Sequence, residues 1–299
     1  MSCTWALIAN PSAGCGRPRR LVEACVAGLQ STGLGVDLSW STGPGHATRL
    51  ANEAVESGTS GIIIAGGDGT ISEVLQAPLP PDLPIGLLPC GSGNDLARSL
   101  GIARGRRAID VILAGHGRQL DLGQCGHRRF ATVAACGLDA AVSEAKLTGH
   151  AALPGTAGYV WATLRTLARH QPTRLRMTGD FGTIQMSTWL VATANTSCYG
   201  GGVRIAPNAQ PNDGLFDVVI VDGALSHSAA LTLLPRTLFG RHLPHPAIRV
   251  ERTPWLQIEP IDSDQQILHA DGERLGHAPA TLCMQPGALR ILTPRPADR

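Results

Sequence analysis

The sequence carries little charge of either sign. Only 16% of its 299 residues are Asp, Glu, Lys or Arg, and the formal net charge is +2. No dense run of Lys and Arg appears, so the charge gives no indication of a nucleic-acid partner. With 43% hydrophobic residues and no low-complexity block, the composition is typical of a globular protein and excludes a disordered or fibrous chain.

Long apolar runs and export signals are also missing. No uninterrupted apolar stretch approaches the ~18 residues that a membrane-spanning helix needs. The first residues, MSCTWALIANPS, lack the basic start, the long apolar centre and the small-residue cleavage site of a signal peptide. We therefore expect a cytoplasmic protein, with peripheral attachment to a membrane as a further option.

Several familiar motifs are absent. None of the eight cysteines has another cysteine three positions away, which excludes zinc-ribbon and CxxC redox motifs. No GxxxxGK[ST] occurs, so the chain has no Walker-type P-loop. A GxGxxG turn between a strand and a helix, followed by an acid ~20 residues on, is missing as well, which excludes a dinucleotide-binding Rossmann motif.

The first part of the sequence alternates between short apolar runs and helical patterns. The runs that predict strands lie at residues 4–10, 35–42 and 61–67, and a fourth, at 84–95, ends in glycines. Patterns with helical spacing lie between them, at 19–33, 45–58 and from 70 onward. Strands interleaved with helices predict an open α/β domain with a parallel sheet.

From about residue 121 the pattern changes to short alternating runs separated by Gly, Pro, Asn and Asp. This pattern predicts an antiparallel, β-sandwich-like domain, interrupted by helices near 155–170 and 225–240. We place the α/β domain at 1–123 and the β-rich domain at 124–287. The last strand, at about 288–299, could return to the first domain.

Three glycine-rich turns follow predicted strands of the first domain. They are Asn10-Pro11-Ser12-Ala13-Gly14, Gly66-Gly67-Asp68-Gly69-Thr70 and Cys90-Gly91-Ser92-Gly93-Asn94-Asp95. Open α/β sheets bind ligands at the carboxyl ends of their strands, and glycine lets a ligand approach backbone N–H groups without meeting a Cβ. One such turn could be a simple connection, but three of them predict phosphate binding.

Asp68 is an acid inside the second of these turns. It could cap the helix that follows, which is a common role for Asp. A carboxylate beside a phosphate also repels it unless a cation lies between the two. The position of Asp68 therefore hints at Mg²⁺ nearby.

Four segments, GGDGT (66–70), GLLPCGSGNDLAR (86–98), YGGGVRIAPNAQPNDGLFDV (199–218) and DGE (271–273), occur in this order. In combination and spacing they resemble the diacylglycerol kinase catalytic-domain family, which includes bacterial soluble lipid kinases and sphingosine and ceramide kinases. GGDGT alone also occurs in the more distant NAD kinases and in some phosphofructokinases. The resemblance covers essentially the whole chain.

The resemblance implies an ATP-dependent kinase with the nucleotide between a phosphofructokinase- or NAD-kinase-like α/β domain and a β-sandwich-like domain. Ser41 stands where the family often has Thr and Thr42 follows it, so either hydroxyl could contact ATP. Ser92 also replaces a more usual Thr, and either hydroxyl can donate to a phosphate. The residues implied to bind the nucleotide are Asn10, Pro11, Ser12, Ala13, Gly14, Ser41, Thr42, Gly66, Gly67, Asp68, Gly69, Thr70, Ser72, Glu73, Ser92, Asn94 and Asp95.

The same resemblance implies a Mg²⁺ site in QPNDGLFD (210–217). Asp213 would supply a carboxylate, and Gln210 and Leu215 would supply main-chain carbonyls. Oxygen ligands at i, i+3 and i+5 suit a hard cation. The residues alone are equally those of a simple turn.

HADGERLG (269–276) contains the two acids that the resemblance places at the catalytic position, Asp271 and Glu273. We expect Asp271 to act as general base, with Glu273 as the alternative. DGE between alternating runs is also typical of a β-hairpin turn. Both interpretations can hold, because a turn is a common place for a functional side chain.

The predicted function is transfer of the γ-phosphoryl group of ATP to a lipid hydroxyl, diacylglycerol-like or sphingoid, with Mg²⁺. The alternatives are a NAD-kinase-like or other small-molecule kinase, and a non-catalytic lipid- or nucleotide-binding protein. The expected partners are the lipid and, transiently, a membrane surface, whereas the oligomeric state stays open, with a homodimer as one option. The helical pattern at 158–176, which contains Trp161 and a basic end, could lie on an anionic membrane or be an ordinary amphipathic core helix.

Overall fold

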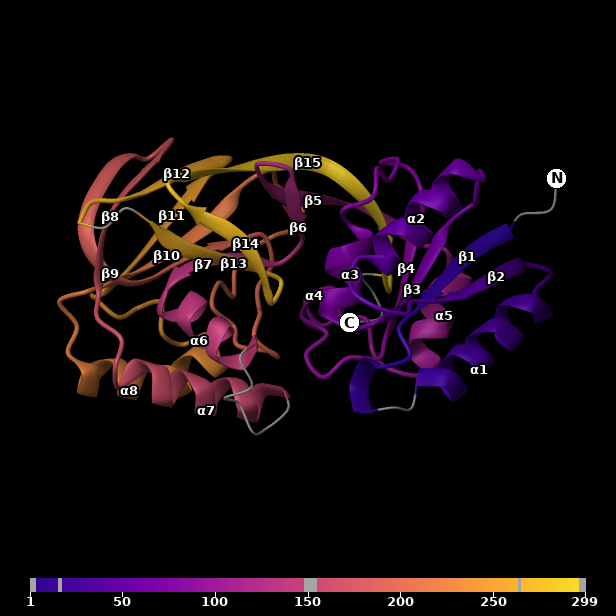
Figure 1. Ribbon diagram of the computed structural model, residues 1–299, viewed down its shortest axis with the longest axis horizontal. Helices are drawn as coiled ribbons and strands as arrows, with labels where there is room; N and C mark the ends of the chain where they lie inside the picture. The colour runs from indigo at the N-terminus through magenta and orange to yellow at the C-terminus, as the bar shows by residue number, and fades with distance from the viewer. Residues whose placement is uncertain (1–3, 16–17, 148–154, 263–264, 296–299) are drawn as a thin grey trace. The chain divides into compact units, whose positions relative to one another are not determined.

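The computed structural model describes the chain except for residues 1–3, 16–17, 148–154, 263–264 and 296–299 (Figure 1). The chain forms two compact units. The first unit comprises Met1–Leu120 and Gly287–Arg299, and the second unit comprises Asp121–Pro286. The two strands that cross from one unit to the other are β5 (Gly117–Cys125) and β15 (Ala280–Leu292).

The first unit is built on a parallel sheet with the strand order β2-β1-β3-β4-β15. The end of β15 joins this sheet beside β4, through Arg290 and Ile291. The strands that belong wholly to this unit are β1 (Thr4–Ala9), β2 (Gly35–Trp40), β3 (Ile62–Gly66) and β4 (Pro84–Pro89). The helices are the 3₁₀ helix η1 (Ala13–Cys15), α1 (Pro18–Ser31), α2 (His46–Glu56), α3 (Asp68–Val74), α4 (Asp95–Ser99) and α5 (Arg106–Ala114).

Helices cover both faces of this sheet (Figure 1). On one face α1 and α5 contact each other, and on the other α2 contacts α3. A central strand between two layers of helices needs apolar side chains on both faces, which is why every residue of β3 (IIIAG) is buried. The parallel arrangement brings the carboxyl ends of β1, β3 and β4 to one edge of the sheet.

The second unit is antiparallel, with the strand order β14-β13-β7-β9-β8-β12-β15. β10 pairs with β9 and β11, and β6 pairs with β5. Its strands are β6 (Arg128–Phe130), β7 (Val133–Gly137), β8 (Thr173–Gly179), β9 (Gly182–Ala194), β10 (Phe216–Asp222), β11 (Ile248–Thr253), β12 (Trp255–Pro260), β13 (Gln266–Ala270) and β14 (Glu273–Ala278). Its helices are α6 (Leu138–Leu147), α7 (Gly155–Leu167) and α8 (His227–Leu238).

Two apolar cores lie on opposite faces of the central strands of this unit. In β7, Ala134 and Cys136 belong to one core, whereas Val133 and Ala135 belong to the other. The second core also includes residues of α7 and α8, which lie side by side with α6 on one side of the strands (Figure 1). The predicted fold class, an open α/β domain followed by an antiparallel β-sandwich-like domain, is confirmed.

The helices of both units are short. Among those in the described part of the chain, α1 has 14 residues and α7 has 13. In the described residues, none reaches the length and apolar character that crossing a bilayer requires.

Candidate active site

The turns after β1, β3 and β4 contact one another at the carboxyl edge of the parallel sheet. Asn10, at the end of β1, donates its side-chain Nδ2 to the Thr70 hydroxyl at 3.1 Å. The main-chain N–H of Cys90 donates to the carbonyl of Gly66 at 2.8 Å. Ser12 lies next to these contacts and donates its N–H to Asn10 Oδ1 at 2.9 Å. The three predicted turns therefore form one continuous patch of main chain.

Asp68 joins the second turn to the third. Its Oδ2 accepts the main-chain N–H of Asn94 at 2.8 Å, and its Oδ1 accepts that of Asp95 at 2.7 Å. Asp68 is thus a helix cap, but it caps α4 and not α3, the helix in which it lies. Burial raises the pKa of the Asp68 carboxyl, and the hydrogen bonds from the main chain oppose that rise.

The glycines in these turns are needed for the turns to pack against each other. Gly14 has φ = 57°, and a Cβ there would lie 1.8 Å from the carbonyl oxygen of Cys90. A Cβ on Gly91 would lie 2.5 Å from the Cα of Gly67, and the Cβ of any residue replacing Gly66 would lie 2.5 Å from the side chain of Thr70. Glycine is therefore required at these positions because the turns lie in contact with one another and leave no room for a Cβ.

The third turn is held by its own side chains and by arginine. Asn94, with φ = 55°, accepts the N–H of Gly91 and donates to its carbonyl, both at 2.8 Å. Arg104 donates to the Gly91 carbonyl at 2.7 Å and to the Ser92 carbonyl at 3.2 Å. The exposed Ser92 is thus next to a guanidinium, which places a positive charge beside the candidate anion site.

The remaining residues expected at the nucleotide differ in exposure. Ser41 is buried, whereas Thr42 is exposed and its hydroxyl lies 2.9 Å from His46 Nδ1. Ser72 is buried as well. The carboxylate of Glu73 accepts the N–H of Ala47 at 3.1 Å, in the first turn of α2. The side chains of Ser72 and Glu73 therefore support the wall behind the glycine turns.

In the second unit, Asp271 occupies the turn between β13 and β14, with φ = 53°. Its Oδ2 accepts the N–H of Ala131 at 2.7 Å, and its Oδ1 accepts the N–H of Thr132 at 2.8 Å and also the Thr132 hydroxyl. The side chain of Glu273 is exposed and makes no hydrogen bond or ion pair with the described residues, although its main chain pairs with Ala270 across the hairpin. Of the two candidate bases, only Asp271 has its carboxylate fixed in direction.

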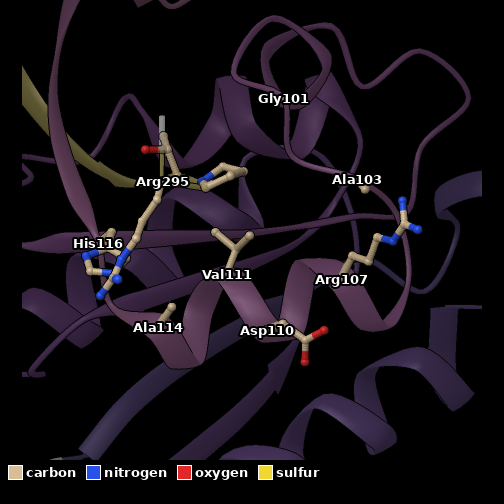
Figure 2. Close-up of a pocket in the computed structure, with 10 residues that line it drawn as sticks. Gly101, Ala103, Arg107, Asp110, Val111, Ala114, His116 and Arg295 are labelled. Atoms are coloured by element: carbon tan, nitrogen blue, oxygen red, sulfur yellow. The ribbon is translucent and has the colours of Figure 1, made fainter. Parts of the chain in front are cut away.

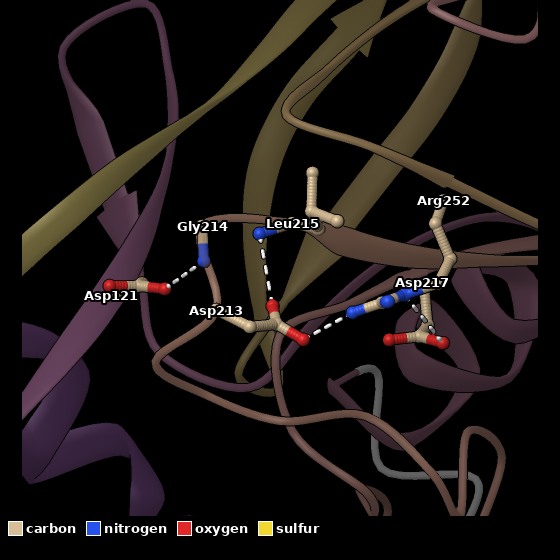
Figure 3. A network of polar contacts seen from close by, with 6 residues as sticks. All are labelled: Asp121, Asp213, Gly214, Leu215, Asp217 and Arg252. Carbon is tan, nitrogen blue, oxygen red and sulfur yellow. Dashed lines mark hydrogen bonds and ion pairs between the residues drawn. The ribbon is translucent and has the colours of Figure 1, made fainter.

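Asp213 belongs to a turn just before β10 (Figure 3). Its Oδ1 accepts the N–H of Leu215 at 3.1 Å, and its Oδ2 is bonded to Arg252. The next residue, Gly214, donates its N–H to the buried carboxylate of Asp121 at 2.7 Å. Two carboxylates thus fix the backbone of this turn from opposite sides.

The charges around Asp213 fit a divalent cation. Asp217 is only 6% exposed, its Oδ2 has no hydrogen-bond partner, and its Oδ1 lies 3.7 Å from Arg252 Nε. Asp213 and Asp217 therefore share one guanidinium, which leaves an excess of negative charge (Figure 3). No cluster of three His, Cys, Asp or Glu side chains suitable for a metal occurs in the described residues, so carbonyls such as those of Gln210 and Leu215 would have to complete the site.

Comparison with known proteins covers both units. The family model described as diacylglycerol kinase catalytic domain matches residues 4–125, and the one described as YegS C-terminal NAD kinase beta sandwich-like domain matches residues 132–293. A diacylglycerol kinase of Mycobacterium tuberculosis (strain ATCC 25618 / H37Rv) is 32% identical, with 96% of this chain and 94% of the relative covered. The chain belongs to the diacylglycerol kinase family.

Other relatives agree with this assignment. A diacylglycerol kinase of Staphylococcus carnosus (strain TM300) is 28% identical, with 97% of this chain and 94% of the relative covered. A crystal structure of a diacylglycerol kinase from Bacillus anthracis str. Sterne aligns with a TM-score of 0.82 at 25% identity and covers 99% of both chains. The family resemblance predicted from the four sequence segments is confirmed.

The sequence analysis missed residues that hold the expected site residues of this diacylglycerol kinase homologue. The sequence does mark Asp121 as unusual, because it is an acid with an apolar residue on each side in the alternating run QLDLGQ. In the structure its side chain is buried. The sequence gives no such signal for Thr132 and Arg252. Their partners are 139 and 39 residues away in the sequence, and nothing local marks them.

The first unit also contains a pocket of about 550 Å³ between α5 and residues 293–295 (Figure 2). None of its lining residues belongs to the three glycine turns, so it is separate from the candidate phosphate site. The side chains of His116 and Arg295 point toward each other there and are hydrogen-bonded (Figure 2).

A smaller apolar cavity of about 70 Å³ lies in the second unit, walled by α6, α7 and α8. Two of its polar residues, Asp139 and Thr163, are themselves buried. Its lining residues are Leu138, Asp139, Val142, Val160, Thr163, Leu190, Tyr199, Val203, Ile205, Leu234, Thr237 and Leu238.

The Asp217→Asn variant tests the electrostatics of the Asp213 turn. Burial raises the pKa of Asp217 above its ordinary value of 3.8, with Asp213 adding to the rise and Arg252 opposing it. The folded state therefore holds the Asp217 proton more tightly than the unfolded state does. The stabilisation by this proton is complete below pH 3.8 and is lost as the pH rises through the folded-state pKa.

We expect the unfolding free energy of the wild type to fall, relative to that of Asp217→Asn, as the pH rises from 4 toward 7. Urea denaturation of both proteins without divalent cations measures the difference. Parallel stability curves for the two proteins would show that Asp217 is solvated or paired in a way that contradicts the structure.

Proposed function

We propose that the chain is a Mg²⁺-dependent kinase that transfers the γ-phosphoryl group of ATP to a hydroxyl group of a lipid, diacylglycerol-like or sphingoid. The observation that carries the proposal is the Asp271 carboxylate, which is fixed by Ala131 and Thr132 in a unit that also holds an apolar cavity. Membership of the diacylglycerol kinase family makes phosphoryl transfer the relevant chemistry.

The first unit binds the triphosphate of ATP. The second turn leads into α3, whose first main-chain N–H groups have no acceptor within the helix, and Arg104 lies beside the third turn, so hydrogen-bond donors and positive charge are both available to phosphate oxygens. Phosphoryl transfer depends mainly on such positioning and charge stabilisation. The two main-chain hydrogen bonds that the Asp68 carboxylate accepts hold the second and third turns together before the nucleotide binds.

The second unit activates the acceptor. The lipid hydroxyl donates its proton to the Asp271 carboxylate while its oxygen forms a bond to the γ-phosphorus, and the bond from phosphorus to the β–γ bridging oxygen breaks to release ADP. The hydrogen bonds from Ala131 and Thr132 hold the Asp271 carboxylate in one orientation.

Mg²⁺ would be held by the carboxylate of Asp213 and the main-chain carbonyls of Gln210 and Leu215. The support for this assignment is the excess negative charge that Asp213 and Asp217 leave around Arg252. A bound Mg²⁺ would supply positive charge that offsets the repulsion between the Asp213 and Asp217 carboxylates.

The lipid chain enters the cavity between α6, α7 and α8. About 70 Å³ is the volume of only about two water molecules, at ~30 Å³ each in the liquid. A longer acyl chain therefore has to separate the helices as it enters. Most of the lining residues are apolar, which matches the chemistry of such a chain.

The same helices carry the membrane contact. Trp161 and Leu164 on α7 are 47% and 37% exposed, Leu231 on α8 is 44% exposed, and Phe239 just after α8 is 69% exposed. Neither α7 nor α8 contains an acid. Exposed arginines accompany these apolar side chains, namely Arg165, Arg169, Arg236 and Arg241. Apolar side chains together with cations fit an anionic bilayer surface.

Replacing Gly14 with alanine tests the nucleotide site. The added Cβ would clash with the Cys90 carbonyl, so the first and third turns must move apart. We expect the dissociation constant of ATP to rise about tenfold or more, because losing one hydrogen bond to a charged group costs ~1.5–3 kcal/mol. Calorimetric titration with ATP and Mg²⁺ measures it.

Gly33→Ala is the matched control for Gly14→Ala. Gly33 also has positive φ, at 82°, but a Cβ there meets nothing within 4 Å. Both variants carry the strain of a left-handed alanine, about 1–2 kcal/mol, and only Gly14→Ala disturbs the turns. Equal ATP affinity in the two variants would remove the first turn from the nucleotide site.

Lipid phosphorylation by the purified protein tests the function itself. With ATP and Mg²⁺, we expect labelled phosphate on a diacylglycerol or sphingoid acceptor and none on NAD or sugars. Chelation of Mg²⁺ should abolish turnover and its return should restore it, and GTP run in parallel shows the nucleotide preference. If only a soluble compound is labelled, that compound and not a lipid is the acceptor.

Asp271→Asn should lower turnover by about 10²-fold or more, because the proton acceptor is lost while ATP binding persists. Glu273→Gln is the matched control, since the Glu273 side chain is exposed and makes no hydrogen bond or ion pair with the described residues. If Glu273→Gln loses the activity and Asp271→Asn keeps it, the two roles are reversed.

Vesicle binding tests the exposed residues of α7 and α8. We expect Trp161→Ser with Phe239→Ser, and separately Arg165→Glu with Arg236→Glu, to lower co-sedimentation with vesicles containing phosphatidylglycerol. Leu113→Ser is the apolar control and Arg106→Glu the charge control, because both residues are exposed on α5 of the first unit. Unchanged binding in both test variants would favour an ordinary amphipathic core helix.

A further inference from the structure

His269 is a buried imidazole two residues before Asp271. It is 2% exposed, and its Nε2 lies 2.8 Å from Oε1 of Glu144 on α6. Its other nitrogen, Nδ1, is buried and has no hydrogen-bond partner in the described part of the chain. An unpaired polar atom in a protein interior is unfavourable, and an apolar side chain could fill the space without it. The residue therefore calls for an explanation beyond packing.

The groups that face this imidazole come from two elements. Glu144 is partly exposed, and Arg274 on β14, which pairs with His269 across the hairpin, has its Nε 3.4 Å from the same Glu144 oxygen. Arg274 is 49% exposed, and a pair so open to water contributes little. The buried contact between Glu144 and His269 is consequently the stronger connection.

Residues 131–144 hold the Asp271 hairpin at two places. At the start of this segment, Ala131 and Thr132 donate to the Asp271 carboxylate. β7 then pairs with β13, and α6 follows directly and reaches His269 through Glu144. The same helix lines the apolar cavity through Leu138, Asp139 and Val142.

We propose that Glu144 and His269 are positioning residues that couple filling of the cavity by a lipid chain to the placement of Asp271. The inference rests on the proposed function, because it takes Asp271 to be the proton acceptor. Neither residue touches a substrate. With the proton on Nε2, the imidazole donates this hydrogen bond to the Glu144 carboxylate.

The connection acts on the rate of transfer and not on nucleotide binding. When α6 shifts as a chain enters the cavity, Glu144 carries the shift to β13, and the left-handed turn at Asp271 moves with the strand. Displacement of a reacting group by about 1 Å can cost ~10²-fold in rate. Breaking the connection should therefore lower kcat at saturating lipid and leave the KM for ATP unchanged.

Variants of Glu144 test the connection in the full-length protein, with a diacylglycerol dispersed in detergent as acceptor. Glu144→Ala should lower kcat by about tenfold to 10²-fold. Glu144→Gln, which still accepts the Nε2–H bond, should restore most of it. Arg274→Ala is the control on the same carboxylate and should keep kcat within twofold. Should Glu144→Ala fail to fold, Glu144→Asp shortens the side chain by one methylene and should act in the same direction.

A double-mutant cycle separates positioning from general destabilisation. If Glu144 acts through Asp271, adding Glu144→Ala to Asp271→Asn causes no further loss of kcat. Equal losses in the two backgrounds would overturn the inference, and so would a wild-type kcat in Glu144→Ala. In both cases the kinase assignment stands.

Amide hydrogen exchange tests the connection even if the protein phosphorylates no lipid, because it does not depend on catalytic activity. Amide hydrogen exchange of Ala131 and Thr132 should be about tenfold faster in Glu144→Ala than in the wild type and unchanged in Arg274→Ala. A wild type that phosphorylates no lipid would end the proposed function, and unchanged exchange at these two amides in Glu144→Ala would end the coupling. The two failures are therefore distinguishable.

Discussion

Carboxylates that accept main-chain N–H groups from distant segments determine the loop structure of both units. Asp68 binds the start of α4, Asp121 binds the turn at Gly214, and Asp271 is bound by Ala131 and Thr132. A hydrogen bond between a charged acceptor and an amide is roughly twice as strong as a neutral one. It also fixes the direction of the loop, because the N–H vector belongs to the backbone itself.

The glycines of the first unit have a structural role in addition to the ligand binding that the sequence indicates. In the sequence they indicate a ligand approaching the main chain, whereas in the structure Gly14, Gly67 and Gly91 let one turn lie directly against another. The two explanations are compatible, since a phosphate can only use amides that are already held in a common surface. Packing between turns supplies that surface before any ligand is present.

Local patterns were sufficient to predict the fold. The run IIIAG is buried on both faces and ends in glycine, so its strand and the turn after it were readable from a few residues. The choice between Asp271 and Glu273 was not readable, because both acids are in one hairpin and differ only in what reaches them from elsewhere. The donors to Asp271 are about 140 residues away, and no local pattern encodes such a contact. Glu144 and His269 are 125 residues apart in the sequence, and no local pattern indicated their contact either.

The return of β15 to the first unit has a consequence for the order of folding. Arg290 and Ile291 complete the parallel sheet beside β4, yet they leave the ribosome only after the entire second unit has been made. Until then β4 presents unpaired backbone groups on that side, which is a template for wrong pairing with another nascent chain. The first unit, although most of it is made earlier, therefore completes its sheet only after the second unit has been translated.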